Sequence, residues 1–255
     1  MPKITLSLCM LAPLLFLGAC QSGAPKTEEG SSSAPSAETG PPNTLTAAEK
    51  ADGWKLLFDG QTTNGWHVFN RDTVTGWAIE NGELIALGEA GLEGLGNDLV
   101  TNDEFENFEL SLDWKVSEAG NSGVFFNVIE GPQYKAVYET GPEYQLIDDE
   151  NFPMELEAWQ FSGANYAMHP PSKKAYNPVG TFNHTRIIVN KGHVEHWLNG
   201  EKVVEYELWT PEWEALVKAG KWKDYPDYGR AHKGHIALQD HGNQAWFRNV
   251  KIRVL

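Results

Sequence analysis

Residues 108–116 are Phe-Glu-Leu-Ser-Leu-Asp-Trp-Lys-Val, and apolar and polar side chains alternate along them without a break. Successive side chains of a β-strand point to opposite faces of its sheet, so this period of two predicts a strand with one buried face. The longest regular pattern in the chain therefore favours a β fold.

Shorter segments on either side have the same character. Asn-Gly dipeptides accept the positive φ angles of tight hairpin turns, and two of them separate pairs of predicted strands. Asn190-Lys191-Gly192 is a third candidate turn, directly after residues 185–189, which are β-branched apart from Arg186. The first two hairpins are residues 77–79 and 83–85 around Asn81-Gly82, and residues 194–198 and 202–206 around Asn199-Gly200.

Many short strands joined by Gly and Asn turns are typical of all-β domains. We therefore predict an all-β fold, an antiparallel β-sandwich of jelly-roll type. One short helix is expected at residues 211–219, because Pro211 suits a first helical turn and Gly220 suits a stop.

The N-terminus has the pattern of a bacterial lipoprotein signal. Lys3 precedes an apolar stretch at residues 4–17, which is too short to span about 30 Å of bilayer as a helix. The stretch ends in Leu17-Gly18-Ala19-Cys20, which resembles the lipobox where a cysteine is acylated after cleavage. We expect residues 1–19 to be a signal peptide and Cys20 to carry the lipid; the alternative is an ordinary secretory signal with a chance cysteine. Gln21 after the cysteine favours anchoring in the outer membrane, if the host is Gram-negative.

Residues 20–50 are rich in Ser, Gly, Pro, Thr and Glu, and Leu45 is their only large apolar residue. Such a segment buries too little surface to offset its ordering entropy, so we predict a flexible linker. Residues 51–255 are then a single β-sandwich domain. After cleavage the only cysteine of the mature protein would be the lipid-carrying Cys20. The domain would then have no thiol for a disulfide, a zinc–thiolate site or a nucleophile.

The formal charge of −15 excludes nucleic acid as an expected partner, since an acidic protein repels phosphate backbones. The sequence has no phosphate-binding glycine loop and no His-Glu-x-x-His helix. Ser122 lies in Asn-Ser-Gly rather than in a Gly-x-Ser-x-Gly nucleophile elbow.

Two polar segments could hold a ligand. In residues 120–127, glycines surround Asn121 and Ser122, whose short side chains could meet a ligand; a plain turn into a strand is the alternative. In residues 143–150, Tyr144 and Leu146 are expected in the core, which leaves Glu143 and Gln145 on the opposite face. Carboxylates and amides on one face can bind sugar hydroxyls, and one carboxylate could act as acid or base. A solvated face followed by an acidic loop at Asp148-Asp149-Glu150 is the alternative.

The third segment is residues 234–242. Gln239, Asp240 and His241 follow a predicted strand, at the rim where loops of a sandwich gather. His241 titrates near neutral pH and is therefore a candidate for proton transfer. A histidine that merely makes a hydrogen bond in a turn is the alternative.

Taken in order, these segments resemble the 3-keto-disaccharide hydrolase domain family, formerly a domain of unknown function. The resemblance covers residues 53–255 and implies a concanavalin-like β-sandwich that cleaves 3-keto-glycosides. It also implies roles that the patterns alone do not give: His241, Glu143 and Asp148 as catalytic residues, and Asn121, Ser122, Gln145, Asp149, Gln239 and Asp240 as substrate-binding residues. The matching motifs are Leu-Phe-Asp-Gly at 57–60, Asn-Ser-Gly-Val-Phe-Phe at 121–126, Glu-Tyr-Gln-Leu-Ile-Asp-Asp at 143–149, Asn-Gly at 199–200, Gly-His-Ile-Ala-Leu-Gln-Asp-His-Gly at 234–242 and Phe-Arg-Asn-Val at 247–250.

The chemistry implied is loss of the proton on C2, which a ketone at C3 acidifies, followed by expulsion of the C1 substituent and addition of water. Members of the family often carry a histidine shortly after the second motif, and residues 150–153 have none. If that histidine is a metal ligand or a base, Glu150 or His169 could replace it here. Whether the protein binds a divalent metal is therefore left open. The alternative function is a lectin-like surface lipoprotein that binds glycans without cleaving them.

Overall fold

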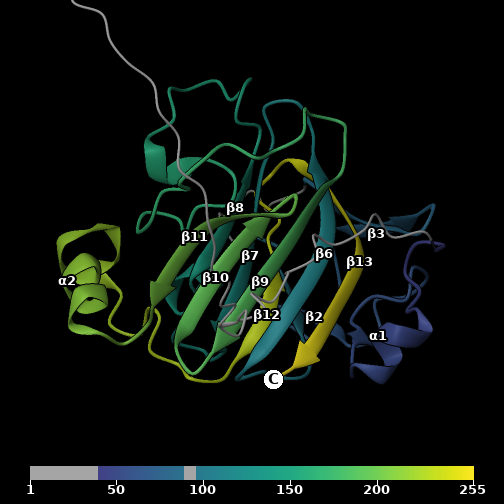
Figure 1. The fold of residues 1–255 in the computed structure, drawn as a ribbon, viewed down its shortest axis with the longest axis horizontal. Coiled ribbons are helices and arrows are strands. Elements are labelled where there is room, and N and C mark those ends of the chain that lie inside the picture. Colours follow the sequence, from purple (N-terminus) through teal and green to yellow (C-terminus); the bar gives the residue numbers. More distant parts are fainter. Residues whose placement is uncertain (1–39, 89–95) are drawn as a thin grey trace, which may run out of the picture. The chain divides into compact units, whose positions relative to one another are not determined.

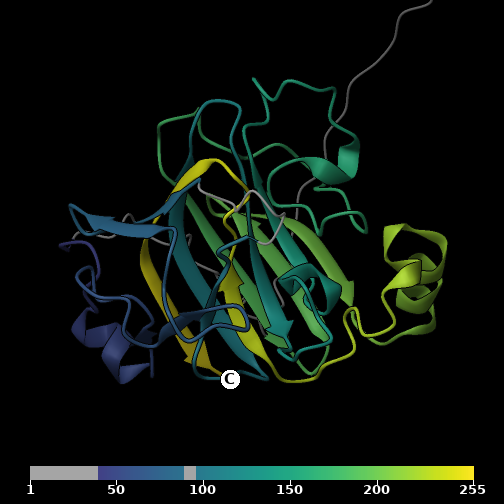
Figure 2. The same cartoon turned by 180° about the vertical axis from the view of Figure 1, so that it is seen from behind.

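The computed structural model describes residues 40–88 and 96–255, which form two antiparallel sheets packed face to face (Figures 1 and 2). This arrangement confirms the predicted all-β, antiparallel sandwich of jelly-roll type. Figure 1 looks onto the larger sheet, and Figure 2 shows the same ribbon from behind.

The larger sheet has eight strands. In spatial order they are β11 (Glu201–Glu207), β10 (His193–Leu198), β9 (Asn183–Asn190), β6 (Phe108–Val116), β13 (Gln244–Val254), β4 (Glu83–Leu87) and β3 (Trp77–Glu80), while β1 (Lys55–Leu56) pairs separately with β13. The smaller sheet has five: β2 (Trp66–Val68), β5 (Leu99–Thr101), β12 (His235–Leu238), β7 (Asn121–Val128) and β8 (Glu143–Ile147).

Helices are few among the described residues. The predicted helix is α2 (Pro211–Ala219), whose first turn is capped by the Thr210 hydroxyl accepting from the Trp213 N–H at 3.2 Å. No helix in the described ranges is long and apolar enough to cross a membrane. The remaining helices are α1 (Ala47–Ala51) and the short 3-10 helices η1 (Val137–Glu139), η2 (Ala158–Gln160) and η3 (Lys221–Asp224).

The hairpin turns lie where the sequence predicts them. Asn81-Gly82, Lys191-Gly192 and Asn199-Gly200 all have positive φ, between 49° and 91°. They join β3 to β4, β9 to β10 and β10 to β11, so the register of each pair is fixed by its turn.

The core lies between the two sheets and is built from alternate residues. Leu110 and Leu112 of β6 meet Val124 and Phe126 of β7, and all four side chains are fully buried. The outward face of β6 departs from the expectation of a solvated face, because Glu109 is buried as well. Two arginines explain this, since Arg186 Nε donates to Glu109 Oε1 at 2.7 Å and Arg253 Nη2 donates to Glu109 Oε2.

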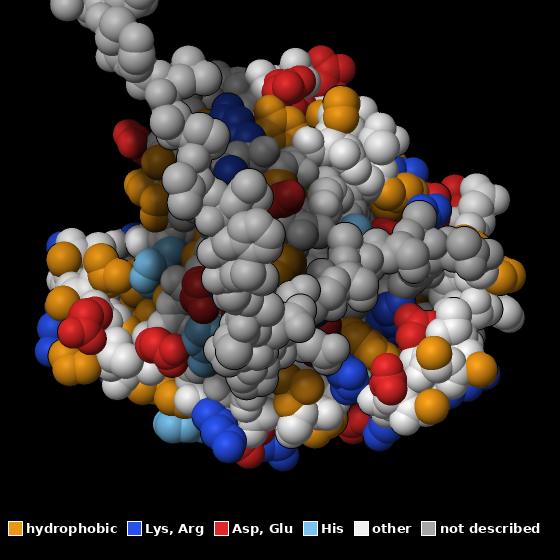
Figure 3. All heavy atoms as spheres, viewed as in Figure 1, with side chains coloured by type: hydrophobic (Ala, Val, Ile, Leu, Met, Phe, Trp, Pro, Cys, Tyr) orange, Lys and Arg blue, Asp and Glu red, His pale blue; other side chains and the backbone are white. Residues whose placement is uncertain are grey.

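The outer face of the larger sheet carries paired charges. Figure 3 shows acidic, basic and histidine side chains intermixed on this side of the molecule, where side chains are described. Lys115 pairs with Glu83 at 3.1 Å, and His184 Nδ1 lies 2.8 Å from Asp113 Oδ1. Polar and charged side chains on this face therefore pair with one another across strands.

The predicted linker ends too late in the chain. The signal peptide, Cys20 and residues 21–39 lie outside the described residues, so these expectations stay predictions. Residues 40–50, however, are described, and Asn43 is buried against β13 rather than part of a flexible tether. Its N–H donates to Asn249 Oδ1 at 2.6 Å, and the Asn249 N–H donates to Asn43 Oδ1 at 2.8 Å. A long-range amide pair of this kind leaves no mark on composition, which explains the error.

The Asn43–Asn249 pair generates a stability prediction. Asn249 has φ +53°, and its side-chain amide also donates to Asp113 Oδ2 at 2.8 Å. Asn249→Ala loses both side-chain contacts and puts alanine, which tolerates the left-handed region less well than asparagine, at φ +53°, so the free energy of unfolding should fall by about 2–4 kcal/mol. Urea unfolding measures the change. Asn249→Gly, which relieves only the strain, should recover part of the loss. An Asn249→Ala protein with the wild-type midpoint would show that the pair does not hold the N-terminal segment.

Candidate functional site

The outer face of the smaller sheet is polar at one end and buried. Tyr144 and Leu146 point into the core, as predicted, while Glu143 and Gln145 share the other face of β8. Asn121 on the neighbouring strand β7 faces the same side, because it pairs with Ile147 across the ladder. The period of two thus delivers amide and carboxyl groups to one surface.

This surface is hollowed into a cavity of about 300 Å³. Its floor comes from β7, β8 and the end of β12, and its walls come from three segments far apart in the sequence, at 96–98, 136–138 and 221–222. The lining residues are Gly96, Asp98, Asn121, Ala136, Tyr138, Glu143, Gln145, Tyr166, Lys221, Trp222, Gln239, Asp240 and His241.

Gly123 makes room for Glu143. The two residues lie on neighbouring strands, and a Cβ at position 123 would lie 2.5 Å from Glu143 Oε1. Real Cβ atoms do not approach an oxygen so closely, so any larger residue would displace the carboxyl group. The glycine of the Asn-Ser-Gly motif therefore serves the cavity through the space it leaves.

Three amide oxygens in the cavity have no hydrogen-bond partner among the described residues: Asn121 Oδ1, Gln145 Oε1 and Gln239 Oε1. A buried acceptor without a partner costs about 1–3 kcal/mol, so such groups are left open where a ligand or water completes them. Sugar hydroxyls are donors of the required kind. The cavity is thus preorganised to accept hydrogen bonds from a polyol.

Three buried carboxyl groups line the cavity, those of Asp98, Glu143 and Asp240. Burial raises the pKa of Glu143 to about 8, although Lys221 lowers it and Asp98 raises it further. Burial also raises the pKa of Asp98 to about 7, against a hydrogen bond that it accepts from the Asp240 N–H at 3.0 Å. Glu143 is therefore mostly protonated at neutral pH and can donate a proton.

His241 lines the same cavity and is an exposed residue. Even so, desolvation by the surrounding protein lowers its pKa, and the Lys221 charge lowers it further. The imidazole is therefore mostly neutral at pH 7 and can accept a proton. Glu143 and His241 have their pKa values shifted in opposite directions, which is the usual arrangement of an acid and a base in one site.

The sequence did not predict which aromatic side chains line the cavity. Tyr138, Tyr166 and Trp222 line one side of the cavity together with Lys221 and Asp98. These residues lie in loops and short helices without periodic patterns, and none lies in a segment selected for its polar residues. The only signal was the abundance of aromatic residues, which does not say where they gather.

The structure brings together six of the nine predicted site residues: Asn121, Glu143, Gln145, Gln239, Asp240 and His241. The other three do not line the cavity. The Ser122 side chain is fully buried on the core side and donates to the Gln239 carbonyl at 2.8 Å. It supports the floor and does not reach a ligand.

Asp148 and Asp149 were also expected at the site, but neither lines this cavity. Asp148 accepts from the N–H groups of Ala119, Glu150 and Asn151 at 2.8–3.1 Å, and these bonds lower its pKa. It holds the loop after β8 in place. Asp149 accepts from the Ser162 N–H at 2.8 Å, also outside the cavity.

The candidate replacements for the missing histidine also lie elsewhere. Glu150 accepts from the Tyr176 hydroxyl at 3.1 Å, and the His169 ring stacks on Tyr206 at 4.7 Å between centroids. Neither lines the cavity.

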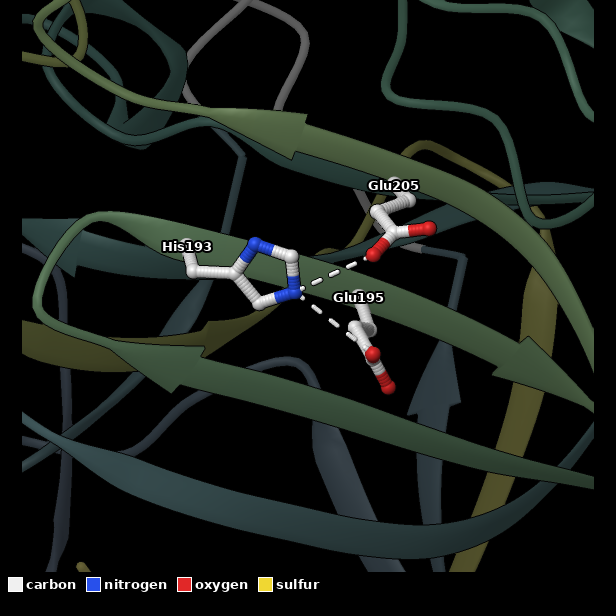
Figure 4. A group of neighbouring side chains, drawn as sticks. All are labelled: His193, Glu195 and Glu205. Carbon is white, nitrogen blue, oxygen red and sulfur yellow. Dashed lines mark ion pairs between the residues drawn. The ribbon is translucent and has the colours of Figure 1, made fainter.

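Within the described ranges, one group of side chains has the spacing of a metal site, His193, Glu195 and Glu205 on β10 and β11. His193 Nε2 lies 3.5 Å from Glu195 Oε1 and 3.3 Å from Glu205 Oε1 (Figure 4). The Lys202 ammonium already pairs with both carboxylates, at 3.2 and 2.8 Å. The group lies on the larger sheet, apart from the cavity, and forms a surface ion-pair network.

Comparison with known proteins agrees with this geometry. Residues 53–253 match a family model described as the 3-keto-alpha-glucoside-1,2-lyase-like domain. A Bacteroides thetaiotaomicron protein named 3-keto-disaccharide hydrolase is 37% identical over 230 residues, which are 80% of this chain and 79% of that protein.

Two solved structures from Parabacteroides distasonis, both of proposed glycosyl hydrolases, are similar as well. One is 44% identical and has a TM-score of 0.80, covering 84% of this chain and 100% of the other. The second is 29% identical with a TM-score of 0.62, covering 79% of this chain and 99% of the other.

The raised pKa of Glu143 predicts how stability depends on pH. The folded state favours the protonated form, so the stability contributed is complete below pH 4.5 and is lost as pH rises through about 8. Glu143→Gln stays neutral and should gain thermal midpoint over wild type, by about a few degrees, between about pH 5 and pH 9. Thermal unfolding across this range is the measurement, with the exposed Glu155→Gln as control. A constant difference between Glu143→Gln and wild type would contradict a buried, protonated Glu143.

Proposed function

This chain belongs to the family of 3-keto-alpha-glucoside-1,2-lyase-like domains, and from this premise we propose that it cleaves glycosides whose sugar ring carries a ketone at C3. One observation carries the proposal for this chain. A neutral imidazole and a protonated carboxyl group share a cavity with three unpartnered amide oxygens.

The amide oxygens orient the sugar. Asn121, Gln145 and Gln239 each offer an acceptor to ring hydroxyls, and the three acceptors come from three adjacent strands or their ends. Tyr138, Tyr166 and Trp222 add ring faces that can pack against the apolar face of a pyranose. The sugar is thus held by directional hydrogen bonds on the floor and by apolar contact at the wall.

The cleavage is a proton abstraction followed by elimination. His241 removes the proton from C2, and the electron pair moves onto the C3 oxygen to give an enolate. The enolate then re-forms the ketone, a double bond forms between C1 and C2, and the C1–O bond breaks. Glu143 protonates the departing oxygen, which completes a 1,2-elimination with general acid and base.

Addition of water turns the elimination into a net hydrolysis. The hydroxyl of water bonds to C1 and its proton goes to the Glu143 carboxylate, while the His241 imidazolium returns a proton to C2. Both residues end in the protonation state in which they began. This route does not need the two flanking carboxylates of an oxocarbenium mechanism.

His241→Ala tests the base. The variant should cleave a nitrophenyl 3-keto-glucoside about 10²–10⁴ times more slowly than wild type above the buffer blank, while calorimetry still detects binding of 3-keto-glucose. His232→Ala, which removes an exposed histidine stacked on Trp209, is the matched control and should keep full activity.

The same assay on the wild-type protein distinguishes the proposed function from two others. It is run both with a chelator and with added divalent cations. We expect nitrophenol to be released from the 3-keto-glucoside but not from its parent glucoside, because only the ketone acidifies the proton on C2. Equal cleavage of the parent would indicate an ordinary glycosidase. Binding without product under every condition would favour the alternative, a glycan-binding lectin that uses the same cavity.

Glu143→Gln tests the acid. A nitrophenolate leaves without protonation and a sugar alkoxide does not, so the loss of kcat should depend on the leaving group. We expect at least about a tenfold greater loss on a 3-keto-disaccharide than on the nitrophenyl 3-keto-glucoside. Equal losses on both substrates would remove Glu143 as the proton donor and leave it as a clamp on hydroxyls.

A further inference from the structure

Lys221 is a cation whose side chain opens onto the cavity at the start of η3. Among the described residues, Lys221 forms no ion pair, and Glu143 acts on it only at longer range. Its charge is left available at the place where the ligand would bind.

Aromatic rings hold the ammonium in position. Lys221 Nζ lies 4.5 Å from the centroid of the Tyr166 ring, 4.8 Å from Trp222 and 6.0 Å from Tyr138. Cation–π contacts of this kind stabilise a cation without neutralising it. The lysine is thereby positioned while its charge stays free for another anion.

The rings themselves are fixed by contacts behind them. Trp222 stacks on Tyr228 at 4.2 Å between centroids, and its Nε1–H donates to the Tyr166 carbonyl at 3.3 Å. Trp222 and Tyr228 are both almost fully buried. The rings belong to the folded core of this end of the molecule and are not a mobile flap.

We propose that Lys221 is the cation that stabilises the enolate oxygen on C3 during the cleavage, a role that rests on the function proposed above. As His241 takes the proton from C2, negative charge develops on the C3 oxygen, and the Lys221 ammonium offers a hydrogen bond and a full positive charge to it. The charge is relieved when the C1–O bond breaks and the ketone re-forms. The lysine keeps its proton throughout, so the step stays balanced.

The surroundings of Lys221 suit this role. Desolvation by the surrounding protein lowers the pKa of Lys221 although the residue is exposed, which makes the ammonium a stronger hydrogen-bond donor; an ionised Glu143 would oppose that shift. A protonated Glu143 does not compete for the cation as a carboxylate would. Preorganised electrostatic groups aimed at developing charge are commonly worth about 10²–10³ in kcat.

Lys221→Met and Lys221→Arg test the proposal, with Lys223→Met as the matched control two residues along the same short helix, where the lysine is exposed and outside the cavity lining. Two rates are measured, cleavage of the nitrophenyl 3-keto-glucoside and exchange of the C2 hydrogen of 3-keto-1,5-anhydroglucitol, which has no substituent on C1, in D2O followed by NMR. The exchange has no leaving group and reports enolate formation alone.

The expected result for Lys221→Met is a parallel loss of about 10²–10³ in kcat and in the exchange rate, with KM changed less than about threefold. Lys221→Arg should recover part of both rates, and Lys223→Met should match wild type. Unfolding midpoints equal to wild type confirm that the variants are folded.

Two outcomes overturn the proposal. A raised KM with unchanged kcat would make Lys221 a clamp for the ground-state sugar, and unchanged exchange with slower cleavage would place it at the leaving group. Failure of the proposed function looks different, because the wild-type protein would then neither cleave the substrate nor exchange the C2 hydrogen.

Discussion

The cavity depends on the period of two along β7 and β8. Tyr144 and Leu146 must enter the core, and this forces Glu143 and Gln145 to the outer face of the smaller sheet. A slip of one residue would bury the carboxyl group between the sheets and expose the tyrosine. The hydrophobic core therefore fixes the register, and the register fixes the floor of the site.

The segments that enclose the cavity floor change the protonation states of its side chains. A polar sheet face open to water would leave Glu143 ionised, as most surface carboxylates are. The loop at 96–98, the segment around η1 and the start of η3 enclose it instead, and burial raises the pKa values of Glu143 and Asp98. Enclosure thus separates the protonation states of Glu143 and His241, which is what an acid and a base in one site require.

The two outer faces of the sandwich differ in whether their charged and polar groups are paired. On the larger sheet the charged groups pair with one another, as Arg186 does with Glu109 and Lys202 with Glu195 and Glu205. In the cavity, Lys221 and three amide oxygens have no such partner among the described residues. Paired groups hold a surface together, whereas unpaired groups in an enclosed space are available to a ligand.

The sequence by itself determined the strands, the Asn-Gly hairpins, the helix at 211–219 and the outward faces of Glu143 and Gln145, because each follows from local periodicity or turn chemistry. The polar segments and the family resemblance together pointed to nine site residues, and six of them line the cavity. Only the tertiary structure decided that Asp148 caps its own loop, that Asn43 docks on Asn249, and that Lys221 and Asp98 enter the cavity. Those facts depend on contacts between segments far apart in the chain or on hydrogen bonds to particular backbone groups, and no pattern of residue types encodes which partner a polar side chain finds.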